Sequence, residues 1–457
     1  MKIAILNGSP KGQTSVTMQY VKYLEENFSD HQFKYFNVSN QIVKLEDSKE
    51  EFDTLMQSIL ECDLVFWAFP LYVYLVHSEY KRFIELIFES DYAKDFKGKY
   101  SASLSTSINF FDHTAHNYIQ AISEDLEMNF ISSFSAKMYD LLAEENREKV
   151  NSFFKEIVNT VSNNRRTSKR FSRIDKKVLE YNPTSPIDQQ KVINRTEKVL
   201  IICDYYDSDT NLGRMVDRFK SLFTQIPELI DLSKEEIKGG CLGCLKCAYD
   251  NDCAYDNQDA IREIYEDKIQ KADIIVFAVT IKDRYFSALF KRFIDRRFFK
   301  THQPQLIGKQ VAYLISGVIS QNNNIDEIIR TSTEFDQGNL VDIIADEYND
   351  VTVIDELLSR TAERLVEFSR ENFIAPMTCR GVSAYKIFRD EIWGELRFLF
   401  RADHIYYKKN KLYDFPQKNL KQRFINLFAN FFYKIPFIRR EIQKNMREHM
   451  IRTFEKL

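Results

Sequence analysis

The first third of the chain alternates between short apolar runs and longer stretches whose apolar residues recur at helical spacing. Residues 3–6 form a fully apolar run, which is typical of a strand buried on both faces. Val16, Tyr20, Val21 and Leu24 then place apolar side chains on one face of a helix. The same alternation predicts helices at 52–60, 78–90, 115–129 and from 144 to about 161, and strands at 64–68, 100–106 and near 134–142. Strands separated by helices of this length indicate a parallel sheet covered on both faces.

After a connector, this pattern restarts. The connector covers residues 164–196, is polar and basic, and contains Pro183 and Pro186, as an interdomain linker does. Lys2-Ile-Ala-Ile-Leu is echoed by Lys198-Val-Leu-Ile-Ile. Three later landmarks recur at a constant distance of 210 residues, with Asp63, Lys81 and Gly98 corresponding to Asp273, Lys291 and Gly308. A constant shift indicates an internal repeat. The sequence therefore predicts two tandem α/β domains, residues 1–163 and 197–377.

Residues 378–457 lie outside the repeat and are predicted to form a basic helical extension. Residues 380–457 hold 18 Lys or Arg and 8 Asp or Glu, a net charge of +10, which leaves −13 for the rest of the chain. Apolar side chains recur there at helical spacing on both sides of Pro436, namely Leu420, Phe424, Leu427, Phe428, Phe431, Phe432 and Ile435 before it and Ile438, Ile442, Met446, Met450 and Phe454 after it. Such a segment can contact a membrane peripherally. The alternative is that its apolar face packs on the acidic domains or on another protein.

Length, charge and cysteine content narrow the class of protein. A chain of 457 residues is long enough for two well-buried cores. The net charge of −3 argues against a partner that is nucleic acid. The longest apolar run, 64–76, has 13 residues and is too short to span a bilayer. The chain starts with a strand rather than a signal peptide, and four of its seven cysteines fall within 13 residues, so we expect a cytoplasmic protein with a cofactor site.

The turn between the first strand and the first helix carries glycines and hydroxyl groups. Asn7-Gly8 ends the strand, and Ser9, Thr14 and Ser15 precede the helix. A strand that runs directly into a helix points backbone N–H groups and the positive end of the helix dipole at one spot, where a phosphate dianion can bind. The motif is neither G-x-G-x-x-G nor a Walker A loop, which disfavours dinucleotide and ATP sites. The alternative is an ordinary turn with a hydroxyl N-cap.

The segment Gly8-Ser-Pro-Lys-Gly-Gln-Thr-Ser15 resembles the phosphate loop of the NADPH-dependent FMN reductase family, whose usual form is G-S-P-R-x-G-N-T. Lys and Gln replace Arg and Asn here, and both keep hydrogen-bond donors in place. The resemblance covers residues 1 to about 375 and implies two flavodoxin-like domains. It also implies that FMN is bound by Ser9, Lys11, Gln13, Thr14 and Ser15.

Two further segments are expected beside this loop, because the carboxyl ends of parallel strands meet at one edge of a sheet. The first, Pro70-Leu71-Tyr72-Val73-Tyr74, resembles the family's S-P-x-Y-W-x segment without its Trp. Its two tyrosines offer flat faces for the isoalloxazine ring. The second is Ser105-Thr106-Ser107, whose hydroxyls can donate to the pyrimidine edge of the flavin.

The second half departs from this pattern at the corresponding positions. Asp204, Asp207 and Asp209 stand where the phosphate loop would be, and no Gly-Ser-Pro is present. Two like charges about 4 Å apart cost on the order of 4 kcal/mol at an effective dielectric constant of about 20. The segment 279–283 also lacks the proline. We therefore expect that the second half does not bind FMN as the first does.

Four cysteines cluster in the second half, with the spacing C-x2-C-x2-C-x5-C, at Cys241, Cys244, Cys247 and Cys253. Zinc sites usually use two C-x2-C pairs held a dozen or more residues apart, which is a different pattern. The run resembles the compact motif of the iron–sulfur flavoproteins, a branch of the same family that carries a [4Fe-4S] cluster, and thiolates three residues apart suit such a cluster. A [4Fe-4S] cluster, a zinc ion, and redox-active or vestigial thiols remain alternatives.

Together these features predict a flavin-dependent oxidoreductase. The resemblance implies FMN in the first domain, the cluster in the second, NAD(P)H or a reduced ferredoxin as donor, and a redox partner or small molecule as acceptor. It also implies an intramolecular pseudo-dimer, with further homodimerisation left open. The flavin supplies the chemistry, so no catalytic side chain is named. Two alternatives are an NAD(P)H:quinone or FMN reductase without a cluster, and a non-enzymatic interaction protein.

Overall fold

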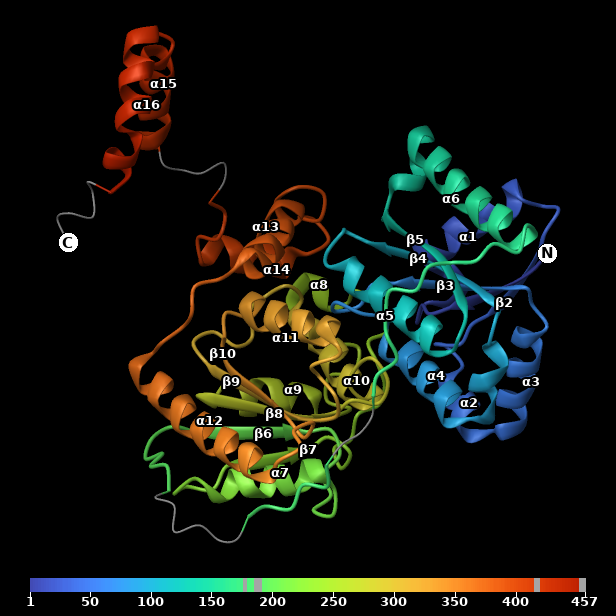
Figure 1. The fold of residues 1–457 in the computed structure, drawn as a ribbon, viewed down its shortest axis with the longest axis horizontal. Helices are drawn as coiled ribbons and strands as arrows, with labels where there is room; N and C mark the ends of the chain where they lie inside the picture. The colour runs from blue at the N-terminus through green and yellow to red at the C-terminus, as the bar shows by residue number, and fades with distance from the viewer. Residues whose placement is uncertain (176–178, 185–190, 415–419, 452–457) are drawn as a thin grey trace. The chain divides into compact units, whose positions relative to one another are not determined.

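Two parallel sheets of five strands each form the framework of the computed structural model, which describes residues 1–175, 179–184, 191–414 and 420–451 (Figure 1). The strands of the first sheet are β1 (Lys2–Asn7), β2 (Gln32–Phe36), β3 (Leu64–Pro70), β4 (Tyr100–Ser107) and β5 (Asn129–Lys137). Those of the second are β6 (Val199–Cys203), β7 (Glu228–Asp231), β8 (Ile274–Thr280), β9 (Gln310–Ser316) and β10 (Asn339–Ala345). The orders β2-β1-β3-β4-β5 and β7-β6-β8-β9-β10 are the same, which confirms the predicted pair of flavodoxin-like α/β domains.

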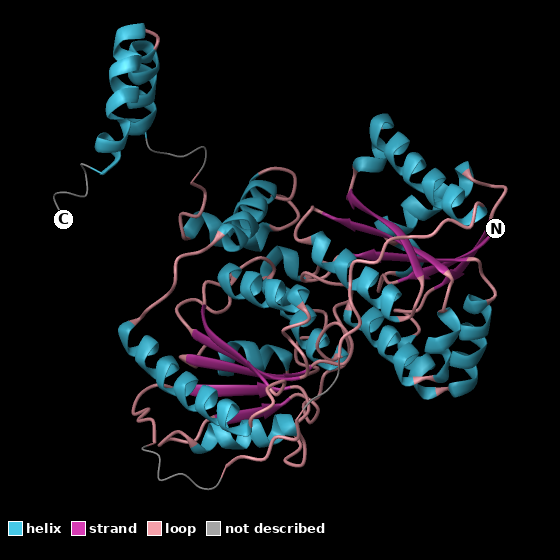
Figure 2. Ribbon diagram, viewed as in Figure 1, coloured by secondary structure: helices cyan, strands magenta, loops and turns pink. Residues whose placement is uncertain are grey.

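Helices cover both faces of the first sheet (Figure 2). They are α1 (Val16–Asn27), α2 (Ile42–Asp47), α3 (Lys49–Leu60), α4 (Ser78–Glu89), α5 (Asp112–Asp125) and α6 (Glu144–Ser162). Helices α1 and α6 pack on one face, where Ile5, Phe66 and Phe154 are fully buried. On the other face Tyr80 of α4 packs edge-on against Trp67 of β3, with 5.9 Å between ring centroids.

The second sheet is covered in the same way. Its helices are α7 (Asn211–Ser221), α8 (Cys247–Asp250), α9 (Ile261–Glu263), α10 (Ala288–Arg296), α11 (Asn323–Phe335) and α12 (Val351–Glu371). Helices α7 and α12 bury Ile201, Val276 and Leu358 against one face. On the other face Phe290 of α10 packs against Phe277 of β8, with 5.7 Å between ring centroids.

Two element boundaries differ from the sequence prediction. Strand β2 was not predicted, because it lies at the edge of the sheet and Phe33 is its only buried residue. Helix α5 ends at Asp125 and β5 starts at Asn129, earlier than the predicted helix 115–129 and strand 134–142. Glu127 adopts a left-handed backbone conformation (φ 56°) that stops the helix, as residues just past a helix end often do.

The two domains meet through helices α4 and α10, which occupy equivalent places in the repeat. The backbone N–H of Ser78, the first residue of α4, donates to Asp295 of α10 (2.8 Å). The N–H of Ala288, the first residue of α10, donates to Glu85 of α4 (2.8 Å). Each helix N-terminus, which carries a partial positive charge, is thus covered by a carboxylate of the other domain. The two hydrogen bonds are related by the same shift of 210 residues, so this pair of contacts is two-fold symmetric.

A buried lysine lies one turn before each of these carboxylates. Lys81 donates to Glu85 (2.7 Å) and to Asp283 of the second domain (2.9 Å), and Lys291 donates to Asp295. Both lysines are fully buried. Burial lowers the pKa of Lys81, but Asp283 and Glu85 raise it by more, so the pKa lies above its usual value. The domains are therefore joined by charges that have no access to water.

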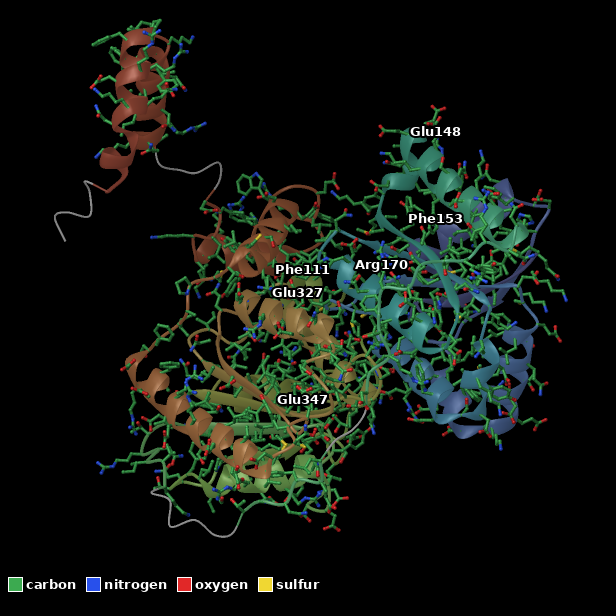
Figure 3. The ribbon with its side chains drawn as sticks, viewed as in Figure 1. Phe111, Glu148, Phe153, Arg170, Glu327 and Glu347 are labelled. Atoms are coloured by element: carbon green, nitrogen blue, oxygen red, sulfur yellow. The ribbon has the colours of Figure 1, made fainter. Side chains whose placement is uncertain are left out.

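Helix α11 adds a second contact between the domains. The side-chain amide of Asn324 donates to the backbone oxygen of Thr114 in α5 (2.9 Å). Figure 3 labels Phe111, which precedes α5, and Glu327 of α11 at this junction. The pairing of α4 with α10 and of α5 with α11 fixes the orientation of the two sheets within the first compact unit of the chain, Met1–His404.

The C-terminal residues fall into two parts. Helix α13 (Cys379–Trp393) packs along α11 in the first unit, where Glu334 accepts hydrogen bonds from the N–H groups of Thr378 (2.8 Å) and Gly381 (2.9 Å). Helix α14 (Arg401–Lys409) follows. The second unit, Ile405–Leu457, contains α15 (Leu420–Tyr433), which has no buried residue, and α16 (Pro436–Ile451). Among the helices described, none has the length and apolar character to cross a membrane. Pro186 and Phe454 lie outside the described residues.

We expect Lys291→Met to destabilise the protein strongly, because it leaves the carboxylate of Asp295 buried without its cation. Breaking a buried ion pair from one side costs about 3–5 kcal/mol. The measurement is the free energy of unfolding in urea, with the thermal midpoint as a second readout. Lys149→Met is the matched control, because Lys149 lies in an exposed pair with Glu145 (2.6 Å). Equal, small effects of the two substitutions would contradict the interface described here.

Candidate functional site

A cavity of about 360 Å³ lies at the carboxyl ends of β1, β3 and β4. This is the edge of a doubly wound sheet at which ligands bind, and the volume is in the usual range for a small-molecule site. All three predicted loops reach it. The predicted site residues that line it are Ser9, Lys11, Ser15, Pro70, Leu71, Tyr72, Val73, Tyr74, Thr106 and Ser107.

The first loop is shaped as a phosphate-binding turn. The N–H of Ser9 donates to the side chain of Asn7 (3.0 Å), and Gly12 takes a left-handed conformation (φ +58°) that lets the chain turn back. Ser15 is the N-cap of α1, and its hydroxyl accepts from the N–H of Met18 (3.3 Å). Val16, the first residue of α1, also lines the cavity, where N–H groups of a first helical turn lack partners within the helix. The positive end of α1 therefore lies at the cavity.

Three predicted site residues are not part of the cavity lining. Gln13 donates from its side chain to Asn37 (3.0 Å), and Thr14 is exposed and donates to the backbone oxygen of Lys11 (2.8 Å). Ser105 is fully buried and bonds one ring nitrogen of His116 (2.8 Å). Sequence spacing could not show which side chains of these loops face the cavity, because consecutive loop residues point in different directions.

The structure places His116 in α5, where it is buried between Ser103 and Ser105, with 2.8 Å from a ring nitrogen to each hydroxyl oxygen. Burial, with a smaller effect of His113, lowers the pKa of His116 to about 4. It is therefore a neutral histidine that ties the helix to the strand.

The second loop makes a tight turn that the other domain holds in place. Tyr72 and Leu75 exchange backbone hydrogen bonds (2.8 and 3.0 Å), and Val73 and Tyr74 between them have positive φ angles of 37° and 67°. Two left-handed residues in succession are the mark of a type I′ turn, which glycine or asparagine normally supplies. Lys291 of the second domain donates to the backbone oxygen of Tyr72 (2.9 Å). A strained turn is thus fixed by the buried cation of the domain interface.

The opposite wall of the cavity was not predicted. It comes from the second domain and from the C-terminal segment, and its members are Leu245, Arg297, Phe298, Thr301, His302, Phe335, Phe388, Leu396, Leu399 and Phe400. The wall is aromatic. The rings of Phe388 and His302 stack with 3.9 Å between centroids, and the ring of Phe388 lies 4.4 Å, centroid to centroid, from that of Phe110 in the first domain. The phenylalanines in residues 388–400 were the available signal, but nothing in the sequence placed them beside the first domain.

The cysteine loop of the second domain is fastened to the first domain. The N–H of Gly240 donates to Glu79 of α4 (2.7 Å), and the ring of His77 bonds the backbone oxygen of Cys241 (2.8 Å). Gly243 has φ +61°, and a Cβ there would lie 2.2 Å from the hydroxyl oxygen of Tyr72. Only glycine allows this approach. The loop therefore forms part of the support behind the second cavity loop.

The four cysteines line one small cavity of about 20 Å³. Burial, reinforced by Asp295 and the neighbouring thiols, raises the pKa of Cys241 to about 12, and burial with the other thiols raises that of Cys247 to about 12. Both are protonated at neutral pH, which is unfavourable for redox-active thiols. Within the described part of the chain, no three His, Cys, Asp or Glu side chains are grouped so that they could hold a metal ion.

The second half carries a charged side chain at a position where the first half has glycine. Asp204 corresponds to Gly8 and is fully buried. Its carboxylate accepts from the N–H of Thr280 (3.0 Å) and the hydroxyl of Ser287 (2.7 Å), and burial raises its pKa to about 6. The side chain of Asp204 thus ties the end of β6 to β8 and to the residue that precedes α10.

Comparison with known proteins identifies the family. The model of the NADPH-dependent FMN reductase family matches residues 1–138 and again residues 198–333, more than half of the chain. The chain therefore belongs to this family of flavin-dependent oxidoreductases, and it carries the family domain twice, as the repeat predicted. No curated protein matches the chain.

Solved structures similar to one domain include several flavoproteins. An FMN-dependent NADH-azoreductase from Bacillus anthracis, solved with FMN, is 12% identical with a TM-score of 0.28, and the match covers 35% of this chain and 98% of that one. A flavoenzyme NAD(P)H:(acceptor) oxidoreductase from Paracoccus denitrificans is 16% identical with a TM-score of 0.31, covering 35% and 97%. The general stress protein 14 from Treponema denticola, with FMN, is 12% identical with a TM-score of 0.27, covering 35% and 98%.

We expect Gly243→Ala to weaken FMN binding and to destabilise the protein, because the new Cβ pushes against Tyr72. Gly308→Ala is the matched control: Gly308 has φ +74°, but a Cβ there meets nothing within 4 Å. The left-handed conformation alone costs about 1–2 kcal/mol in either variant. The clash should cost about 1–3 kcal/mol more in Gly243→Ala. Unfolding in urea and FMN titration measure the two effects, and indistinguishable variants would refute the contact.

Proposed function

We propose that this protein is an NAD(P)H-dependent flavin reductase that binds one FMN in the first domain and passes electrons to a small-molecule acceptor. The observation that carries the proposal is the 360 Å³ cavity, which has the hydroxyl loop and the N-terminus of α1 at one end and aromatic side chains at the other. FMN has the same division between a phosphate and a flat ring.

The residues present fit each part of the cofactor. Ser9, Ser15 and the first-turn N–H groups of α1 supply donors for the phosphate, and Lys11 supplies a positive charge. The turn of Tyr72 and Tyr74 forms the side on which the ring would lie. Thr106, whose hydroxyl bonds that of Thr17 (2.6 Å), and Ser107, whose hydroxyl accepts from the N–H of Asn109 (2.8 Å), lie where its polar edge would be. When bound, FMN supplies hydride and electron transfer. The protein supplies position, a water-poor aromatic surrounding and hydrogen bonds.

The same reasoning supports one flavin per chain. In the second half, the buried carboxylate of Asp204 and the exposed acidic residues Asp207 and Asp209 replace the hydroxyl loop. An N-terminus of α7 that follows these carboxylates is a poor phosphate site, since like charges repel. The second domain instead contributes part of the far wall of the first domain's cavity.

The iron–sulfur hypothesis has one observation in its favour, the gathering of Cys241, Cys244, Cys247 and Cys253 around one cavity. The space of about 20 Å³ is close to that of a single water molecule, far less than an eight-atom cubane needs. The thiols in this arrangement therefore do not fit a [4Fe-4S] cluster, and no electron-transfer step is assigned to one. We favour the reductase without a cluster. Counting iron and sulfide on protein prepared without oxygen decides between the two.

The reductase proposal predicts that purified protein is yellow, with one FMN per chain, and that Ser15→Asp abolishes binding. Aspartate is as good an N-cap as serine, so the helix is preserved. Its charge opposes the phosphate by on the order of 4 kcal/mol, which lowers FMN affinity at least about 100-fold. Thr210→Asp is the matched control, because Thr210 caps α7 in the second half. FMN is measured by fluorescence titration and its reduction by bleaching with NADPH.

Three results would speak against the proposal. Protein that binds no FMN would favour the non-enzymatic alternative. Equal loss of affinity in Ser15→Asp and Thr210→Asp would move the phosphate site away from α1. Bound FMN that neither NADPH nor NADH bleaches would leave a flavoprotein with another electron donor.

A further inference from the structure

One histidine and one aspartate in the wall of the cavity form a hydrogen-bonded pair. The ring nitrogen Nδ1 of His302 lies 2.7 Å from Asp403, and the backbone N–H of His302 also donates to that carboxylate (3.2 Å). Thr301 donates a third hydrogen bond to it through its hydroxyl. Asp403 is fully buried, and these donors from the second domain satisfy its carboxylate.

This arrangement sets the role of the imidazole. The carboxylate accepts a hydrogen bond from Nδ1–H, which fixes the tautomer, so a proton that the ring gives to a ligand leaves from Nε2. His302 lines the cavity, and its ring is held between Phe388 (3.9 Å between centroids) and Phe400 (4.8 Å). The hydrogen bond to Asp403 and the contacts with the two phenylalanine rings therefore fix the orientation of the imidazole ring. An imidazole held in this way beside a flavin cavity has the features of a proton donor.

The cavity around it selects a class of acceptor. Phe298 and Phe400 (6.2 Å apart) and Phe110 with Phe388 line the end opposite the hydroxyl loop. A wall of this composition stabilises a flat aromatic molecule by burial and ring contacts. It offers few hydrogen-bond partners to a charged or strongly hydrated molecule.

We propose that His302, positioned by Asp403, donates the proton that accompanies two-electron reduction of a flat quinone-type acceptor in this cavity. This inference rests on the proposed function, which supplies the reduced flavin. With reduced FMN bound, a hydride would pass to the quinone, and Nε2 of His302 would give a proton to the resulting hydroquinone anion. Neutral hydroquinone would leave the cavity, and His302 would recover its proton from water. His302 is the catalytic residue and Asp403 the positioning residue.

The test compares two acceptors in the same enzyme. Ferricyanide takes electrons without protons, whereas a benzoquinone needs both. General acid catalysis contributes about 100- to 10,000-fold, so His302→Gln should lose at least about 10-fold more kcat with benzoquinone than with ferricyanide. Asp403→Asn should show the same preference to a smaller degree, and Asp403→Glu should restore part of it. Thermal melting confirms that each variant folds.

The outcomes separate the inference from the proposed function. Equal losses with both acceptors in His302→Gln, or a change in KM for benzoquinone alone, would overturn the proton-donor role while the reductase stands. Wild-type protein that reduces neither acceptor would overturn the reductase itself.

A second inference rests on a different observation, the exposed face of α15. Leu420, Phe424, Leu427, Phe428 and Phe431 recur on one face of this helix, and each is more than 60% exposed. Apolar residues at this spacing normally pack on a core. Aromatic side chains exposed in this number are typical of a helix whose apolar face meets another surface.

Charge indicates which surface this is. Residues 420–445 carry Lys421, Arg423, Lys434, Arg439, Arg440 and Lys444, but Glu441 as the only carboxylate. Two copies of so basic a segment would repel each other, which disfavours pairing with a second chain. An anionic bilayer attracts each such cation by about 1 kcal/mol and accepts aromatic side chains at its interface. We infer that α15 and the start of α16 dock on an anionic membrane surface.

Vesicle sedimentation of the full-length chain tests the docking. We expect binding to vesicles of phosphatidylcholine with phosphatidylserine to be at least about 10-fold stronger than to phosphatidylcholine alone, and to weaken with salt. Changing Phe424, Phe428 and Phe431 to Ser should abolish it. The matched control changes three exposed apolar residues elsewhere to Ser, namely Val43, Leu142 and Ile226.

Two results would overturn the membrane inference. One is a chain that does not sediment with anionic vesicles. The other is a wild-type dimer in gel filtration that the Phe variant alone dissociates, which would assign the exposed face to a second copy.

Discussion

The site depends on one constraint: helices α4 and α10 each place a carboxylate on the N-terminus of the other. Glu85 and Asp295 each cover the N-terminus of the other domain's helix (2.8 Å), and Lys81 and Lys291 neutralise them in a region without water. Buried ion pairs add little net stability, but a buried charge without its partner is strongly destabilising. Any other alignment of the two domains would separate these charges, so few alternatives are tolerated. The register that results places Lys291 on the backbone oxygen of Tyr72. The turn of one domain that lines the cavity is therefore held by a side chain of the other.

The two halves keep the same scaffold and differ where ligands would bind. At the end of the first strand, Gly8 in the first half lies against Tyr80, where a Cβ would come within 2.6 Å of the ring. The second half has Asp204 at this position, and its carboxylate bonds Thr280 and Ser287 instead. The same strand end is thus packed against α4 by a ring in the first half and tied to β8 by a carboxylate in the second. The second half supplies the cysteine loop and part of the aromatic wall of the first domain's cavity.

Sequence periodicity predicted the fold class because its signal is local. Fully apolar runs such as 64–68, flanked by helical patterns, indicate buried strands, and the 210-residue shift of Lys81 and Lys291 indicated the repeat. The same reasoning found the three cavity loops, since parallel strands end at one edge. It could not find the wall of Phe298, His302 and Phe388, because that wall depends on how two domains and a later segment pack. Nor could it tell that Ser105 bonds His116 rather than a ligand.

The C-terminal segment changes what each domain can do alone. Helix α13 reaches the cavity only because it packs along α11 of the second domain, and Lys137 of the first domain bonds Glu391 within it (2.9 Å). The hydroxyl loop and the turn at Tyr72 belong to the first domain, whereas His302 and Asp403 lie beyond residue 300. A flavin could thus be bound by contacts that are mostly local to the first domain. The aromatic wall opposite the hydroxyl loop, in contrast, forms only where both domains and the segment 379–403 meet. Under the proposed function, reduction of the flavin and its reoxidation would therefore depend on different parts of the chain.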